Sequence, residues 1–312
     1  MNIALGLRLP VLLAARKQDS LAATGSWRWL WVAPIVLALL VTTVYPTLFI
    51  LGLAATKSTL GRPFGDFLAA QQIIAALQDS VFLSALLKSV TYALLISVVQ
   101  LALGLAIALL LSSLRRTGRV LLSLVLLPLM TAPVMVGVAW KLILAPAGGL
   151  LNGILQRWQW IAEPVSFLGS PSLAWWSIAV ADIWQWTPFV VILSWAALAT
   201  LPDGVRDAAR VDGARPWQCF RWITLPLIAA PLASIFLLKL ILSFKLFDLV
   251  FVLTFGGPGF ETTTASFSIW RATLEEFDVG KAAAQTLVYA IVVALVTLPV
   301  VRLQRRLEGN EQ

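Results

Sequence analysis

The chain has 312 residues, of which 60% are hydrophobic and only 12% are charged, and its mean hydropathy is +0.89. These values lie outside the range of soluble globular domains and indicate an integral membrane protein. A single cysteine and no histidine leave no disulfide framework, no Cys/His metal cluster and no histidine-based catalytic triad to propose. The net charge of +8 is typical of basic cytoplasmic loops in a membrane protein, so we expect no nucleic acid partner.

Six apolar segments are each long enough to cross a lipid bilayer, which takes about 20 mainly apolar residues. They lie at about residues 29–53, 82–111, 120–144, 173–200, 223–253 and 284–303. Backbone that faces lipid has no water to bond, so each segment is expected to be a helix. The sequence therefore predicts an all-α, polytopic membrane protein, with an N-terminal segment over 1–28, a six-span domain over 29–303 and a tail over 304–312.

The distribution of basic residues predicts the orientation of these spans. Placing the N-terminus inside puts fourteen of the 23 lysines and arginines on the inner side and five in the outer loops. This asymmetry follows the positive-inside rule and predicts that both termini are cytoplasmic. The opening residues 1–17 resemble a signal peptide, but Arg8 interrupts the apolar stretch and Arg16 follows it, so we expect no cleavage.

Two ionisable residues fall well inside spans, Asp182 in the fourth and Lys239 in the fifth. At a helix rise of about 1.5 Å per residue, they lie roughly 27 Å and roughly 24 Å from the inner ends of their spans, and therefore at similar depth. Charges are costly in lipid, so the two should face a polar cavity or each other. The predicted solute pathway is formed by side chains on the same helical faces: Asp182, Gln185, Trp186, Phe189, Lys239 and Ser243. A structural ion pair that never meets a solute is the alternative.

The predicted pathway is close to electrically neutral. Asp182 offsets Lys239, and no arginine lies in the apolar interior of a span, so we expect a neutral solute rather than a phosphate ester. A polar cleft with indole rings suits a ligand that is rich in hydroxyl groups. Lys245 and Asp248 lie nearer the predicted outer rim, and we expect both to extend toward the interface.

The cytoplasmic loop between the fourth and fifth spans, about residues 201–222, is densely charged. Asp203 is placed to cap a short helix over 205–211. Gly213 then permits a turn, and Pro216 suits the first position of a second helix. A loop that served only as a positive anchor would need arginines in no particular order.

The order of residues in this loop resembles the EAA loop of ABC importer permeases. In the stretch DAARVDGARPWQCFRWITLPLIAAP, residues 207–231, the family's residues stand at Ala208, Ala209, Asp212, Gly213, Ala214, Phe220, Ile223, Leu225, Pro226 and Pro231. Asp207 stands where the family usually has Glu, which keeps the carboxylate on a shorter side chain. The resemblance implies that the loop couples the chain to an ATPase subunit through a helix that docks in a groove, with these coupling residues: Asp207, Ala208, Ala209, Asp212, Gly213 and Ala214.

Further segments resemble the carbohydrate-uptake branch of the same family, and the resemblance covers about residues 30–305. The segments are WQWTPFVVILSWAALATLPDGVRDAA, FKLFDLVFVLTFGGPG and TTTASFSIWRATLEEFDVGKAAA. Phe255 departs from the family, which commonly has Gly there. The resemblance implies the type I ABC importer transmembrane fold, a bacterial inner membrane location, and one half of the translocation pathway for a sugar, polyol or similar hydroxylated solute.

The same resemblance implies partners. The chain has no Gly-rich phosphate loop that ends in Gly-Lys-Ser or Gly-Lys-Thr, so ATP and Mg²⁺ are expected on a separate ATPase. This chain is then expected to bind no cofactor and to be no enzyme itself. The implied complex contains a second, homologous permease in a heterodimer, two ATPase subunits and an extracytoplasmic solute-binding protein.

Other functions remain open on the sequence alone. Glycerol or a glycerol-phosphate-type solute is an alternative within the same family. An ion-driven secondary transporter would be expected to show paired inverted repeats with interrupted spans, which the sequence does not show. A membrane enzyme would need clustered His, Cys or acidic residues, which the sequence lacks.

Overall fold

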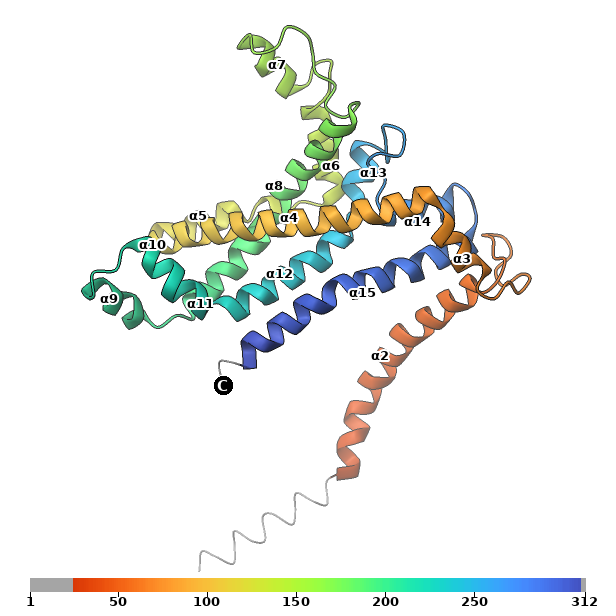
Figure 1. The fold of residues 1–312 in the computed structure, drawn as a ribbon, viewed down its shortest axis with the longest axis horizontal. Coiled ribbons are helices and arrows are strands. Elements are labelled where there is room, and N and C mark those ends of the chain that lie inside the picture. The colour runs from red at the N-terminus through yellow and green to blue at the C-terminus, as the bar shows by residue number, and fades with distance from the viewer. Residues whose placement is uncertain (1–24, 310–312) are drawn as a thin grey trace, which may run out of the picture.

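The computed structural model describes residues 25–309 and is built from helices, with no β-strand in that range (Figure 1). The first 24 residues, which include the signal-peptide-like stretch, and the last three residues lie outside the described part. Four long helices form most of the bundle: α2 (Gly25–Ala54), α4 (Ser80–Ser113), α8 (Pro171–Ala199) and α15 (Val279–Gly309). Each contains a stretch long and apolar enough to cross a membrane, and they correspond to the first, second, fourth and sixth predicted spans.

The third predicted span, 120–144, is not one continuous helix. It consists of α5 (Arg115–Val125), η1 (Pro128–Met130) and α6 (Pro133–Ile143), with a bend of 90° between its two halves. Pro133 has no N–H to continue a helix, and it favours extended backbone at Ala132, where ψ is 136°. The third predicted span is therefore a bent pair of helices, which can still count as one span.

The fifth predicted span, 223–253, is also broken. The helix α10 (Pro216–Cys219), the π-helical turn η2 (Phe220–Thr224) and α11 (Leu225–Leu227) lead into α12 (Ala229–Phe244) through a bend of 72°, and α13 (Asp248–Leu253) follows a second break. Pro226 and Pro231 remove backbone donors on both sides of the bend. The described chain thus has four continuous candidate spans, or up to six if each bent pair counts as one.

The helices pack so that the predicted inner and outer loops lie at opposite ends. Helix α4 packs along α8 and α12, while α15 packs against α12, α2 and α14 (Ala265–Leu274). Helix α9 (Asp203–Val211) lies with α10 and α11 at one end of the bundle, whereas α3 (Gln71–Gln78) and α14 lie at the other (Figure 1). Helix α7 (Leu150–Arg157) stands away from the bundle beyond α6.

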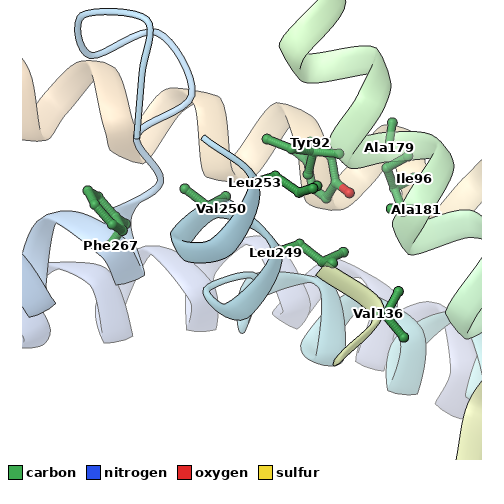
Figure 2. Packing of buried hydrophobic residues seen from close by; sticks show 10 residues of the cluster. Tyr92, Ile96, Val136, Ala179, Ala181, Leu249, Val250, Leu253 and Phe267 are labelled. Atoms are coloured by element: carbon green, nitrogen blue, oxygen red, sulfur yellow. The ribbon is translucent and has the colours of Figure 1, made fainter. Parts of the chain in front are cut away.

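A buried apolar cluster holds the short helix α13 against its neighbours (Figure 2). Leu249, Val250 and Leu253 of α13 pack there with side chains from α4, α6, α8 and α14. The other labelled members are Tyr92, Ile96, Val136, Ala179, Ala181 and Phe267. Close packing on several sides fixes α13 after the break, although the helix has only 6 residues.

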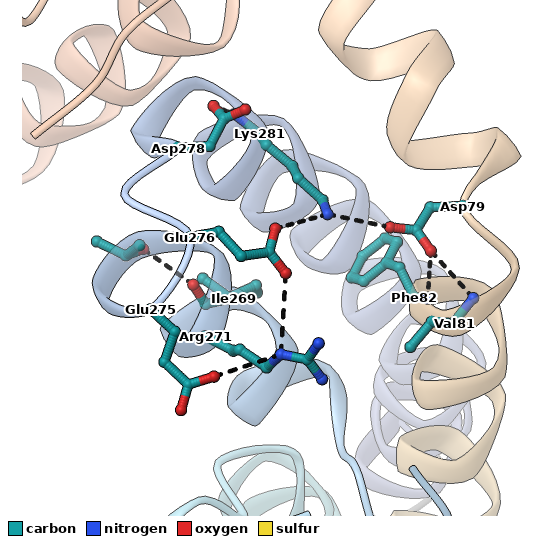
Figure 3. A network of polar contacts seen from close by, with 10 residues as sticks. Asp79, Val81, Phe82, Ile269, Arg271, Glu275, Glu276, Asp278 and Lys281 are labelled. Carbon is teal, nitrogen blue, oxygen red and sulfur yellow. Dashed lines mark hydrogen bonds and ion pairs between the residues drawn. The ribbon is translucent and has the colours of Figure 1, made fainter. Parts of the chain in front are cut away.

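A polar network joins the ends of α4, α14 and α15 at the end of the bundle opposite α9 (Figure 3). Asp79 accepts hydrogen bonds from two backbone N–H groups in the first turn of α4, and its Oδ2 lies 3.4 Å from Lys281 Nζ. Lys281 Nζ also lies 2.8 Å from Glu276 Oε2, and Arg271 pairs with Glu275 and Glu276. Partly exposed pairs contribute little individually, but this network orders three helix ends together.

The close approach of α4 to α8 depends on Gly104. A Cβ built at Gly104 would lie only 2.7 Å from the Cβ of Val190. We expect Gly104→Ala to push the helices apart and to lower the free energy of unfolding by about 1–3 kcal/mol. Thermal unfolding in detergent measures this, with Gly153→Ala in α7 as the matched control, since a Cβ there meets nothing within 4 Å. Equal unfolding temperatures for the two variants would contradict the tight crossing.

Candidate functional site

A pocket of about 190 Å³ opens between α8, the end of α12 and the start of α13. Its charged, polar and indole side chains are Asp182, Gln185, Trp186, Ser243, Lys245 and Asp248. Pro133 at the start of α6 and apolar residues around the break between α12 and α13 complete the wall. Among the side chains that the structure describes, no group of three or more His, Cys, Asp or Glu residues is placed to hold a metal ion. Carboxylate, amide, hydroxyl and indole groups together suit a ligand rich in hydroxyl groups.

Asp182 and Lys239 form a buried ion pair at this pocket. Lys239 Nζ lies 3.7 Å from Asp182 Oδ2, and the two residues are 1% and 5% exposed, respectively. The same ammonium lies 5.5 Å from the ring centroid of Trp186. Asp182 lines the pocket, whereas Lys239 lies behind it and is not part of the wall. The structure therefore brings together the two charges that similar depth predicted to be neighbours.

The remaining predicted pathway residues occupy different places. Gln185, which is 2% exposed, lines the pocket and donates from Nε2 to the backbone oxygen of Thr131, 3.0 Å away. Trp186 and Ser243 also line it, and Ser243 Oγ lies 3.2 Å from Ser97 Oγ of α4. Phe189 does not line the pocket; it packs against an apolar cluster formed by α4, α8 and α12. A contact between any of these residues and a solute stays a prediction.

One further residue at the site, Gln100, escaped the sequence analysis, and two others, Lys245 and Asp248, were expected to extend toward the interface. Gln100 of α4 is fully buried, and its Nε2 donates to the backbone oxygen of Asp182 at 3.0 Å and to Oδ2 at 3.2 Å. Its signal in the sequence is the one amide side chain within the second predicted span. Lys245 and Asp248 line the pocket rather than extending to the rim, because α12 ends at Phe244 and the chain leaves the helix there.

The predicted coupling loop forms a helix, a turn and a second helix, as expected. Gly213 has φ +77°, and the N–H of Ala214 donates to the oxygen of Ala209 at 3.0 Å, which closes α9 with a Schellman-type end. Helix α10 then begins at Pro216. Helix α9 begins at Asp203 itself, and the side chain of that residue lies outside the described part.

The predicted coupling residues on α9 and its turn differ in exposure. Ala209 is buried, Ala214 is half-buried, and Ala208 and Asp212 are exposed. Asp207 lies on α9, but its side chain is outside what the structure describes. At the end of α9, Val211 is 87% exposed, so its apolar side chain is accessible to a partner next to the exposed Asp212. Such a surface suits a helix that docks in a groove of a partner.

Comparison with known proteins gives consistent matches. The family model described as "Binding-protein-dependent transport system inner membrane component" matches residues 100–310. The chain is 29% identical to a trehalose/maltose transport system permease protein of Thermococcus litoralis, over 89% of this chain and 94% of that protein. It is 30% identical to an sn-glycerol-3-phosphate transport system permease protein of Salmonella choleraesuis, over 76% of this chain and 80% of that one.

A solved structure supports the fold. The chain matches one in the crystal structure of a bacterial ABC transporter involved in the import of the acidic polysaccharide alginate, with a TM-score of 0.78. The match covers 93% of this chain and 99% of the other, at 22% sequence identity. The expected importer transmembrane fold is therefore confirmed.

The burial of the Asp182–Lys239 ion pair predicts how substitutions at these two residues change the stability of the chain. Asp182→Asn or Lys239→Gln leaves one buried charge without its partner, so we expect each to lower the free energy of unfolding by about 3–5 kcal/mol. The double variant Asp182→Asn/Lys239→Gln removes both charges and should recover most of that loss. Thermal unfolding of the purified chain in detergent measures all three. Losses that simply add in the double variant would show that the two side chains do not interact.

Proposed function

The chain belongs to the family of binding-protein-dependent transport system inner membrane components, and on this premise we propose that it is a permease subunit of an ABC importer for a sugar, polyol or similar hydroxylated solute. It would form half of the translocation pathway. Family membership removes the ion-driven secondary transporter that the sequence alone left open. The trehalose/maltose relative supports a carbohydrate-like solute.

The observation that carries this proposal is the charge balance of the pocket. Asp182 is matched by Lys239 behind it, and Asp248 is matched by Lys245 on the wall. Acceptors and donors are therefore present without a net charge, while Trp186 offers an aromatic face for C–H groups. A neutral polyhydroxylated solute can bond to this wall without leaving a buried charge unpaired.

One observation favours a phosphate ester as the second candidate. Lys245 is exposed on the pocket wall, where its ammonium would meet a phosphate group, and a glycerol-3-phosphate permease is among the relatives. Against this, the wall contains no arginine for bidentate phosphate contact, and Asp182 and Asp248 would repel the anion. The neutral solute remains the better match.

We propose that α9 docks on an ATPase subunit and that ATP and Mg²⁺ bind there, so that this chain holds no cofactor and catalyses no hydrolysis itself. The exposed Val211 and Asp212 support that contact. In this arrangement the end carrying α9–α11 faces the cytoplasm, as do both termini, which agrees with the basic residues of the loop. The complete complex would contain two ATPase subunits and a second, homologous permease.

The opposite end of the bundle is proposed to meet the extracytoplasmic solute-binding protein. The segment after α13 carries the exposed Glu261, and Glu275 and Glu276 follow α14. Glu261 also pairs with Lys88 of α4, at 3.3 Å, which holds this segment against the bundle. A positioned acidic surface favours encounter with a basic surface of a partner.

The coupling turn gives a first functional prediction. Gly213→Pro is incompatible with φ +77°, and Asp207→Lys reverses a charge on α9, so each should leave the chain inserted but abolish solute-stimulated ATP hydrolysis by the complex. Gly204→Ala, in the same loop but without positive φ, is the matched control and should hydrolyse ATP normally. Normal stimulation in Gly213→Pro would rule out the coupling role of the turn.

The proposed solute is tested by uptake into proteoliposomes. The complex with its second permease, ATPase and binding protein is given labelled trehalose, maltose and sn-glycerol 3-phosphate, and we expect ATP-dependent uptake of a neutral sugar. Lys239→Gln should weaken that uptake moderately, and Asp182→Asn should weaken it more, because it leaves the lysine unpaired. Omitting the second permease is the control and should abolish uptake.

The opposite pattern would overturn the neutral-solute proposal. If only the phosphate ester is taken up, and its uptake is lost in Lys239→Gln but spared in Asp182→Asn, then the lysine is an anion site. Uptake by this chain and the ATPase without the second permease would refute the heterodimer.

A further inference from the structure

Gln100 is a polar residue in an apolar place. It lies in the middle of α4, it is fully buried, and the residues next to it in sequence are Val99 and Leu101. Burying an amide in an apolar environment costs free energy unless its donors and acceptors are bonded. A leucine would fill a similar volume without that cost. The contacts of the Gln100 amide should therefore explain why a polar residue stands at this position.

The contacts of Gln100 are both to one residue on another helix. Its Nε2 donates to the backbone oxygen of Asp182 at 3.0 Å and to the carboxylate Oδ2 at 3.2 Å. Since both partners are acceptors, the opposite orientation of the amide would place oxygen against two oxygens, so the orientation is determined. Its Oε1 is buried without a hydrogen-bond partner among the described residues. The amide therefore makes two hydrogen bonds through its nitrogen and none through its oxygen.

Asp182 is thus held from two sides. Gln100 reaches its Oδ2 from α4 at 3.2 Å, and Lys239 reaches the same oxygen from α12 at 3.7 Å. Without the amide, Lys239 would be the only charged or amide side chain that contacts that oxygen among the described residues. With the amide in place, the carboxylate stays at the pocket wall.

We propose that Gln100 is the positioning residue of the translocation pocket: it holds the carboxylate of Asp182 as an oriented acceptor for solute hydroxyl groups. Its contact with Asp182 is independent of the solute, whereas the effect on solute selection rests on the proposed function. A charged hydrogen-bond acceptor with a defined orientation distinguishes a correctly placed hydroxyl from an analogue that lacks it.

The contact with Asp182 is tested without any solute or partner. Dicyclohexylcarbodiimide reacts with neutral carboxylic acids in apolar sites and leaves a stable N-acylurea, which mass spectrometry locates on Asp182. Because donated hydrogen bonds favour the charged carboxylate, Gln100→Leu should raise labelling of Asp182 by about tenfold. Gln100→Met, with a more adaptable side chain, tests the same contact if the leucine variant does not fold.

Gln285→Leu is the matched control. Gln285 of α15 is also buried in a membrane-spanning helix, with an Oε1 that lacks a partner among the described residues, but it does not line the pocket. Its replacement should leave the labelling of Asp182 unchanged. Unchanged labelling in both Gln100 variants, or an equal rise in Gln285→Leu, would overturn the positioning role.

The effect on the pathway is tested with an exchange variant. Gln100→Glu/Asp182→Asn keeps an amide beside a carboxylate and the same net charge, but it moves the charge from α8 to α4. If Gln100 positions the acceptor, uptake of labelled trehalose or maltose, normalised to the amount of complex, should fall at least about tenfold, as for a lost charged hydrogen bond. Full uptake by the exchange variant would show that the pair only joins two helices and would overturn the proposal.

These results separate the two proposals. Raised labelling of Asp182 in Gln100→Leu, together with a wild-type complex that takes up none of the tested solutes, would support the contact and count against the proposed solute class. Normal uptake with unchanged labelling in Gln100→Leu would support the proposed function and refute the role of Gln100.

Discussion

The burial of one ion pair constrains much of this structure. A charge inside a membrane-spanning bundle is tolerated when a partner and hydrogen-bond donors compensate for lost water. Asp182 and Lys239 therefore require α8 and α12 to lie side by side, and the amide of Gln100 requires α4 to pack closely on α8. Gly104, one turn further along α4, permits that approach at Val190. The ion pair and the amide of Gln100 thus constrain how three mainly apolar helices pack.

The broken spans follow a related rule. Backbone that leaves the helical pattern within a membrane has to find partners for its free carbonyl groups. At the break before α6, the oxygen of Thr131 accepts from Gln185. At the end of α13, the oxygen of Val252 accepts from Lys141 Nζ at 3.0 Å. After α12, the oxygen of Leu246 accepts from Thr264 Oγ1 at 3.0 Å. These side chains allow irregular backbone to line a pocket rather than face lipid.

The sequence predicted those features that depend on local pattern. Apolar length indicated the spans, helix rise placed Asp182 level with Lys239, and the glycine of the loop predicted the turn that Gly213 makes. The breaks in the third and fifth spans were not predicted from the sequence, because hydropathy is averaged over a window and does not depend on the position of a proline. Gln100 escaped for another reason: its partner is 82 residues away, and only the packing of α4 on α8 makes the two neighbours.

The same fold connects the proposed coupling loop to the pocket through a single helix, α12. Helix α12 begins directly after the bend that follows α9–α11, and it carries Lys239 and Ser243 near its far end. At a rise of about 1.5 Å per residue, Lys239 lies roughly 16 Å along this path from Ile228. Ile228 is fully buried against α4 and α8, so a displacement at α9 acts on α12 at a packed point rather than through a loose linker. The ion pair lies where α12 meets α8, so a displacement passed along α12 from the end that carries α9 would reach the contact beside the pocket wall.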